Sequence, residues 1–541
     1  MILFLPAIVQ SQPLPPQQET ATSAKMDQAA QGPVKFIDRN NKVQNPILWA
    51  DVPDIAIVRV GQTYYMSSTT MHMSPGLPIM KSTDLVNWQI ASYAYETLAD
   101  TDELNLKDGK NDYGKGSWAS SLRYHNGTFY ATTFSLTTKK TYLYSTKNPN
   151  KTPWKSTTFT SMFYDHSLFF DDDGRVYMVS GNEGNMRLTE LNSELTGVKP
   201  GGVDQVIIHH ASEVAGGIVG LQAEGSQMFK INGKYYLCNI TWPQRDMRTE
   251  IIHRADSLTG PYEGRVMFHY EGVAQGGLID TPKGDWYAYL FQDHGAVGRT
   301  PFLVPMKWVD GWPVLGEDGK APETLNIPAK LGVSGIVASD EFSRKPGDRP
   351  LPLVWQWNHN PDNANWSVTA HPGSLRLTTA RVDTELTQAR NTLTQRTFGP
   401  ASSATTAIDV THMKDGDYAG LVAFQKKYGF VGVKEVDGAS SIVMTSAESN
   451  KPNELASIPL NQKTVYLRID CDFKERTDKA YFYYSLNGKD WSAIGEPLHM
   501  VYDIPHFMGY RFGLFNFATQ TAGGFVDFDY MRLSDKIIAV P

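Results

Sequence analysis

The sequence predicts an all-β protein in which a five-bladed β-propeller is followed by a β-sandwich of the jelly-roll type. Three observations support this fold class. A strand–turn–strand unit with an aromatic-rich second strand recurs five times between residues 55 and 290. Each unit is followed by a second pair of strands that ends in a related turn. Beyond residue 335, short alternating strands continue without helical periodicity.

The five units have the spacing of propeller blades, because their first residues are 47 to 65 positions apart. In the first unit, the apolar run 55–60 turns at Gly61 and returns through the aromatic pair Tyr64-Tyr65. The five hairpins are expected at residues 55–66, 120–133, 167–179, 226–238 and 276–290. Four strands in each unit place the propeller at residues 34–335.

The sandwich is expected at residues 336–541. It follows a turn-rich boundary at residues 339–350, and alternating strands then recur, for example at residues 374–378, 464–470 and 480–485. A pattern of short strands without long helices is typical of two packed sheets.

Residues 1–33 are expected to be a leader or a disordered tail. The apolar start at residues 1–9 precedes a Gln, Pro, Ser and Ala-rich stretch but lacks the basic residues of a complete secretion signal. The expected location is therefore secreted or periplasmic, with a cytoplasmic location as the alternative. No later apolar run is long enough for a transmembrane helix.

Composition and charge narrow the class of partner. The 541 residues carry a formal charge of −7 and no Lys/Arg-rich run, which argues against nucleic acid or an anionic membrane and favours a neutral substrate. The two cysteines, Cys238 and Cys471, lie far apart and form no CxxC pattern, so neither a disulfide framework nor a zinc site is indicated. The sequence does not indicate an oligomeric state.

The blade register places acidic residues at equivalent positions. Each innermost strand is entered by a residue that stands ten to twelve positions before the aromatic of the second strand: Asp54, Trp118, Asp165, Glu224 and Gln275. Because the innermost strands of a propeller line its central channel, the three carboxylates are expected to converge on one cavity. A single acid at such a position is more often a turn or cap residue, whereas three acids in register indicate a site.

Three converging carboxylates have the chemistry of a glycosidase. One carboxyl can protonate the leaving oxygen of an acetal while a second acts on water or attacks the anomeric carbon. A third carboxylate raises the pKa of the acid and keeps it protonated at working pH. Asp51 is a rival to Asp54 because it lies three residues upstream, but the blade register favours Asp54.

Three ordered motifs resemble glycoside hydrolase family 43, the β-xylosidases and α-L-arabinofuranosidases. They are Asn45-Pro-Ile-Leu with Pro53-Asp54 and Lys81-Ser-Thr-Asp-Leu-Val-Asn-Trp88, then Phe163-Tyr-Asp165, then Ala223-Glu224-Gly-Ser-Gln. The resemblance implies that Asp54 is the general base, that Asp165 tunes the pKa and orients the substrate, and that Glu224 is the general acid of an inverting reaction. The sequence departs from the family at Ile55-Ala56 and at His166, next to the acids but not at them.

Four further residues are candidates for binding the substrate. Trp118 could pack on the apolar face of a sugar or between blades. The resemblance implies that Arg299 reaches sugar hydroxyls, that the loop of Met71 builds one wall of the sugar pocket, and that His294 lies beneath the pocket, where it holds Ca²⁺ or water. In the sandwich, Asp340 and Asp529 are candidate ligands of a structural Ca²⁺. No organic cofactor is indicated.

The function expected from the sequence is that of an inverting, exo-acting glycoside hydrolase that releases xylose or arabinose from xylo-oligosaccharides or arabinoxylan. The alternative within the enzyme class is an endo- or exo-arabinanase. The alternative from another class is a non-catalytic, carbohydrate-binding propeller, but binding a neutral sugar does not require three carboxylates in register.

Overall fold

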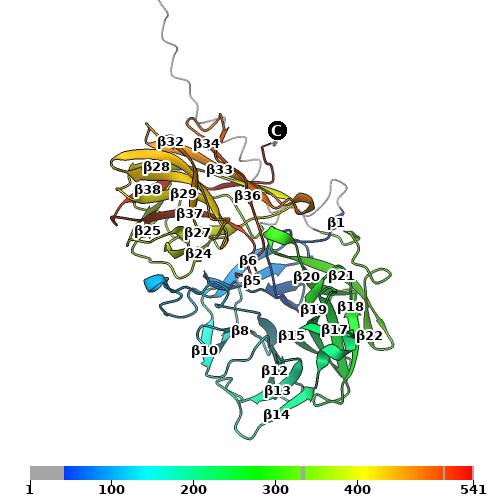
Figure 1. The fold of residues 1–541 in the computed structure, drawn as a ribbon. Coiled ribbons are helices and arrows are strands. Elements are labelled where there is room, and N and C mark those ends of the chain that lie inside the picture. Colours follow the sequence, from blue (N-terminus) through cyan, green and yellow to red (C-terminus); the bar gives the residue numbers. More distant parts are fainter. Residues whose placement is uncertain (1–41, 330–334, 504–505, 539–541) are drawn as a thin grey trace, which may run out of the picture.

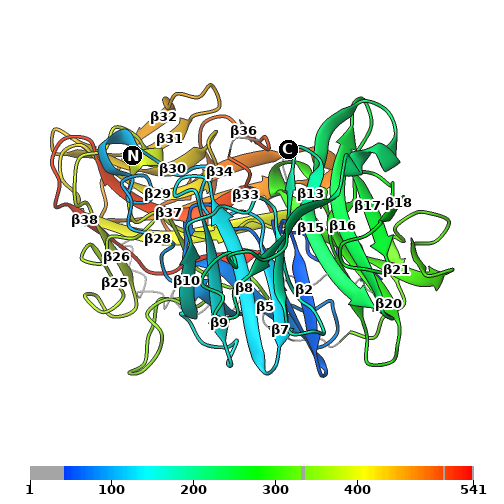
Figure 2. The ribbon, with the colours of Figure 1, turned by 90° about the horizontal axis from the view of Figure 1, so that it is seen from below.

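The computed structural model describes residues 42–329, 335–503 and 506–538, and it confirms the all-β architecture. Figures 1 and 2 show a propeller, blue to green, packed against a sandwich, yellow to red. The expected leader at residues 1–33 lies outside the described residues. Within the described part of the chain, no helix is long and apolar enough to cross a membrane. The helical elements described there are short 3₁₀ turns: η1 (Lys107–Gly109), η2 (Ala211–Ala215), η3 (Gly295–Val297), η4 (Leu386–Gln388) and η5 (Lys474–Arg476).

Five four-stranded antiparallel sheets form the blades, as the repeats predict. Blades one and two contain β2 (Ala56–Val60), β3 (Thr63–Ser67), β5 (Gly76–Ser82) and β6 (Gln89–Tyr95), then β7 (Ser121–His125), β8 (Thr128–Ser135), β9 (Lys140–Thr146) and β10 (Lys155–Phe159). Blade three contains β11 (Ser167–Phe170), β12 (Val176–Asn182), β13 (Asn185–Leu191) and β14 (Asp204–Ile208). Blades four and five contain β15 (Val219–Ile231), β16 (Lys234–Pro243), β17 (Thr249–Ala255) and β18 (Glu263–Phe268), then β19 (Ala274–Asp280), β20 (Trp286–Asp293), β21 (Arg299–Val309) and β22 (Trp312–Leu315).

The innermost strands form a closed ring, in which β2 contacts β7, β7 contacts β11, β11 contacts β15, β15 contacts β19, and β19 contacts β2. Among the described residues, each blade is built from consecutive strands, and none combines a strand from the start of the propeller with strands from its end. The ends are instead joined by a short ladder between β1 (Val43–Gln44) and β23 (Thr324–Leu325). Beside it, the side chain of Asn45 donates to the carbonyls of Leu303 and Pro322 and accepts from the Leu303 N–H, at 2.9 to 3.0 Å. The side chain of Asn45 therefore links the segment before the first blade to the last blade by hydrogen bonds.

Two large sheets form the sandwich. The eight-stranded sheet has the order β32-β31-β30-β29-β37-β27-β24-β4, with β32 (Asn453–Pro459), β31 (Ala439–Ser446), β30 (Gly429–Val436), β29 (Asp417–Phe424), β37 (Arg511–Ala518), β27 (Leu393–Arg396), β24 (Gln356–Asn358) and β4 (Met73–Ser74). The second sheet contains β25 (Trp366–Ser367), β26 (Leu375–Thr378), β38 (Phe525–Phe528), β28 (Ala401–His412), β33 (Thr464–Asp472), β34 (Lys479–Ser485), β35 (Ser492–Ala493), β36 (Leu498–His499) and β39 (Arg532–Ser534).

The two domains share a strand pairing and a core. Strand β4 belongs in sequence to blade one, yet Met73 and Ser74 pair with β24 of the sandwich. A single buried apolar cluster includes Trp88 and Tyr289 of the propeller as well as Trp355 of the sandwich. The loop before β5 is thus held by both domains, and the sandwich is packed against the propeller as part of one core.

Candidate active site

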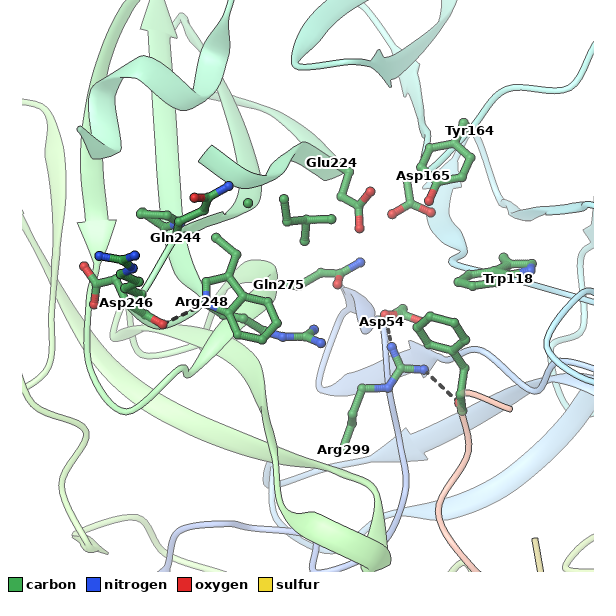
Figure 3. A pocket seen from close by; sticks show the side chains of 16 residues that line it. Asp54, Trp118, Tyr164, Asp165, Glu224, Gln244, Asp246, Arg248, Gln275 and Arg299 are labelled. Atoms are coloured by element: carbon green, nitrogen blue, oxygen red, sulfur yellow. Dashed lines mark hydrogen bonds and ion pairs between the residues drawn. The ribbon is translucent and has the colours of Figure 1, made fainter. Parts of the chain in front are cut away.

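A pocket of about 660 Å³ lies near the point where the innermost strands begin. The five residues at the equivalent blade position all line it: Asp54, Trp118, Asp165, Glu224 and Gln275. Figure 3 shows Asp54, Asp165 and Glu224 directed into the same space from different blades. The sequence register therefore identifies residues that the fold brings together.

The backbone turns these residues toward the channel. Asp54, Asp165 and Gln275 have φ values of 51°, 42° and 55°, and Gly225, directly after Glu224, has a φ of 64°. A non-glycine residue in this left-handed region costs on the order of 1–3 kcal/mol and persists only where the surrounding structure imposes it. The same backbone conformation therefore recurs at the equivalent position of three blades.

Two donors hold the buried carboxylate of Asp54. The hydroxyl of Thr69 donates to Oδ2 at 2.6 Å, and Nη1 of Arg299 donates to Oδ1 at 2.8 Å. Asp51, the rival candidate, is not among the residues that line the pocket, and its Oδ1 accepts the backbone N–H of Arg299 at 2.8 Å. The carboxylate of Asp54 therefore faces the pocket, whereas Asp51 lies outside the lining and binds the backbone of Arg299.

Asp165 and Glu224 share an environment that favours a proton. Burial raises the pKa of Asp165 well above its ordinary value, and the charges of Glu224 and Asp54 raise it further. Burial, followed by the charge of Asp54, raises the pKa of Glu224 to about 7. Because the repulsion between two neighbouring carboxylates is mutual, the pair titrates together and retains a proton near neutral pH.

The pocket contains residues that the motifs did not single out. Tyr164 lines it directly before Asp165, and a segment of blade four, residues 242–248, forms another side. In that segment Arg248 lies over the ring of Trp242 at 5.3 Å and pairs with Asp293 at 2.9 Å. The sequence places this segment after a predicted strand, but nothing in it indicates that the loop folds back over the channel.

Phe507 comes from the sandwich and completes the pocket. Its ring meets Trp118 edge to face with centroids 4.8 Å apart, and its carbonyl accepts from Nη2 of Arg299 at 3.3 Å. Phe507 lies about 190 positions beyond β22, the last strand of the blades, and no sequence pattern links it to the acids. The catalytic pocket is thus built by both domains.

Arg299 and Trp118 line the pocket as expected, but Met71 and His294 are not among the lining residues. Met71 is buried in a small cluster with Met73 and Met508, which packs against Trp118 and Phe507. Met71 therefore packs behind the pocket wall and does not form it. Strand β4, which follows Met71 in the chain, pairs with β24 and so joins the sandwich sheet.

The described residues show no cluster of three ligands at the calcium sites expected from the sequence, and calcium binding stays a prediction. His294 is only half buried and packs on Trp49, with ring centroids 4.8 Å apart. Burial and the nearby charge of Arg476 lower the pKa of His294 to about 4.

In the sandwich, the carboxylate of Asp340 already accepts hydrogen bonds from Arg344 at 2.7 Å and from the indole N–H of Trp355 at 2.8 Å. Within the described residues, no group of three His, Cys, Asp or Glu side chains is arranged to hold a metal. Asp529 accepts a hydrogen bond from the Ser374 hydroxyl at 3.4 Å and belongs to no such group among the described residues.

Three carboxylates that meet in one pocket of a five-bladed propeller, two of them with raised pKa values, are the arrangement of a glycoside hydrolase of the acid–base type. Two family models match the chain: residues 43–313 match the glycosyl hydrolases family 43, and residues 339–534 match the β-xylosidase C-terminal concanavalin A-like domain. The chain belongs to glycoside hydrolase family 43.

Individual relatives cover nearly all of the described chain. A β-xylosidase of Formosa agariphila is 29% identical over 95% of this chain and 94% of its own. The structure of a bifunctional GH43-CE protein of Bacteroides eggerthii is 60% identical with a TM-score of 0.90, over 92% of this chain; the match spans 64% of that longer protein. An engineered GH43 enzyme, described as both endo-xylanase and exo-arabinofuranosidase, is 32% identical with a TM-score of 0.81, over 92% of this chain and all of its own.

Proposed function

We propose that this protein is an inverting, exo-acting glycoside hydrolase that releases xylose, arabinose or both from xylo-oligosaccharides or arabinoxylan. The observation that carries the proposal is the convergence of Asp54, Asp165 and Glu224 in one pocket. The activities in the names of the similar proteins support the choice of pentose substrates.

The three acids are assigned separate roles. Glu224, whose pKa is raised to about 7, is the general acid that protonates the leaving oxygen. Asp54, oriented by Thr69 and Arg299, is the general base that takes a proton from the attacking water. Inverting enzymes need room for this water, so the two carboxyls are expected to be about 6.5–9.5 Å apart. When Glu224 holds the proton that the pair shares, Asp165 carries the negative charge beside it and orients the substrate.

Aromatic and polar side chains supply the binding surface. The rings of Trp118 and Phe507 offer apolar faces to a sugar, and Arg248 and Gln275 offer hydrogen-bond donors to its hydroxyls. Contact between Trp118 and Phe507 limits the pocket on one side, which supports an exo-acting enzyme over an endo-acting arabinanase. No step is assigned to calcium. A secreted or periplasmic location remains part of the proposal, to be tested by cell fractionation.

The test is the hydrolysis of three substrates: an aryl β-xyloside, an aryl α-L-arabinofuranoside and xylobiose. We expect turnover of at least one, and proton NMR during the first minutes should show α-xylose as the first product from a β-xyloside. The appearance of β-xylose before mutarotation would contradict inversion. A lack of turnover on all three substrates would favour the non-catalytic binding propeller.

A further inference from the structure

A second pocket of about 280 Å³ lies where one end of the eight-stranded sheet meets the propeller. Its sandwich side comes from η4 and from the turns that follow β29 and β31, and its propeller side comes from the segment between β6 and β7. The residues that matter for its chemistry are Tyr113, Glu385, Gln388, Lys426, Asn450 and His506. None of them lines the catalytic pocket.

The lining suits a small, neutral, polyhydroxylated ligand. Gln388 and Asn450 provide amides that both donate and accept, and Glu385 and Lys426 contribute one charge of each sign. The rings of Tyr113 and His506 are stacked, with centroids 5.0 Å apart and planes at 24°. Polar groups around an aromatic wall are the usual elements of a sugar site, because a sugar has hydroxyl edges and an apolar face.

Local contacts hold the polar groups in place. The hydroxyl of Thr387 donates to Glu385 at 2.7 Å, and the hydroxyl of Tyr113 donates to the Thr387 carbonyl at 2.8 Å. The side-chain oxygen of Gln388 is buried and has no hydrogen-bond partner within the described residues. A buried polar atom without a partner is costly, and a ligand or water that reorients this amide would relieve the cost.

The aromatic wall is uncharged. Burial, followed by the nearby charge of Lys426, lowers the pKa of His506 to about 3. Behind it lie His359 and His72, whose pKa values burial also lowers well below the ordinary value. The stacked pair in the lining is therefore uncharged at any physiological pH, which favours a neutral sugar over an anion.

We propose that this second pocket binds a pentose or a short pentose oligosaccharide, independently of the catalytic pocket. Its volume is just below the range of about 300–1,000 Å³ typical of drug-sized ligands, and so suits one or two sugar rings. The choice of pentose rests on the proposed function, since the enzyme releases pentose beside this pocket. The two pockets are neighbours: His506 lines the second, and the next residue, Phe507, lines the catalytic one.

The experiment counts binding events by isothermal titration calorimetry with xylobiose, on the full chain carrying Asp54→Asn so that the ligand is not hydrolysed. We expect two events. Adding Trp118→Ala should weaken one of them at least tenfold, and adding Glu385→Gln or Gln388→Leu should weaken the other at least tenfold. Glu496→Gln, an exposed carboxylate outside both pockets, is the matched control and should change neither. Thermal melts of each variant verify folding.

Three results would overturn the proposal: a single event in the Asp54→Asn protein, loss of both events with Trp118→Ala, or two unchanged events in folded Glu385→Gln and Gln388→Leu variants. The proposal would also be overturned if the second pocket bound the free amino acid glycine and not xylobiose. Free glycine matches the opposite charges of Glu385 and Lys426 without using the aromatic wall. Failure of the second site leaves hydrolysis by the wild-type protein intact, whereas failure of the proposed function shows as absent hydrolysis, so the two are distinguished.

Discussion

At the scale of single residues, Asp54 and Glu224 differ in what they are bonded to. Asp54 is held by Thr69 and Arg299, whereas the pKa of Glu224 is raised by partial burial and by the charge of Asp54. A general acid matters in proportion to how much the leaving group needs a proton, but a general base is needed whatever leaves. The two assignments can therefore be separated by the choice of leaving group.

We expect Glu224→Ala to lower kcat/KM for xylobiose by about 10²–10⁴-fold while largely sparing an aryl xyloside with an acidic phenol. Asp54→Ala should abolish both activities, and Asp51→Ala should spare the chemistry because Asp51 does not line the pocket. Steady-state kinetics on the two substrates are the measurement. If Asp54→Ala keeps aryl activity and Glu224→Ala loses it, the acid and base are reversed.

Asp165→Asn tests the mutual repulsion within the acidic pair. With a negative charge removed from beside Glu224, the pKa of Glu224 should fall. A general acid must be protonated, so the basic limb of the kcat/KM profile should move to lower pH, together with a large loss on xylobiose. Asp246→Asn, which removes a charge at another part of the pocket lining, is the control and should leave the basic limb in place. An unmoved limb in Asp165→Asn would rule out the pKa role.

At the scale of elements, the sandwich segment that carries Phe507 acts as part of the propeller's site. We expect Phe507→Ala to lower kcat/KM for xylobiose about five- to thirtyfold, since it removes an aromatic contact of roughly 1–2 kcal/mol with Trp118 and with the sugar. Phe525→Ala, in a sandwich strand outside the pocket, should leave kcat/KM unchanged. Equal kinetic losses in both variants would show a general stability effect in place of a binding role.

At the scale of the whole molecule, the two domains depend on each other. A chain ending at Gly335 would lose the partner of β4, the sandwich part of the shared core and Phe507. We expect such a chain to be insoluble or nearly inactive, because truncation exposes a large apolar face and opens the pocket. Solubility and xylobiose kinetics are the measurements, and an unchanged kcat/KM would show that the sandwich is an accessory module.

The contact between domains should also be sensitive to acid. His72, His359 and His506 are buried there in neutral form, with pKa values lowered below 6.5 by burial. In the unfolded chain each takes up a proton near pH 6.5, so their contribution to stability is present above that pH and declines below it. The loss is on the order of 1 kcal/mol per pH unit for each histidine.

We therefore expect the melting temperature to fall steeply between pH 6.5 and 5, and the fall to be shallower in His72→Phe. His209→Phe, at an exposed position, is the control and should retain the wild-type slope. Calorimetry across this pH range is the measurement. A wild-type slope in a folded His72→Phe variant would show that His72 does not contribute to the acid sensitivity.

The sequence by itself determined the blade number, the hairpins and the register of Asp54, Asp165 and Glu224. It could do so because these features are local: a strand alternates with period two, a turn follows at a fixed offset, and the repeat returns each blade to the same point of the channel. The same register also found Trp118 and Gln275, both of which line the pocket.

Only the tertiary structure decided which side chains close the pocket and which merely support it. Phe507 reaches the site through the packing of two domains, and Met71 is withdrawn from it because β4 pairs with β24. Arg344 occupies Asp340, where the sequence suggested a metal. These outcomes depend on contacts between segments far apart in the chain, and such contacts leave no periodic signal in the sequence, because each side chain needs only to fit its neighbours in space.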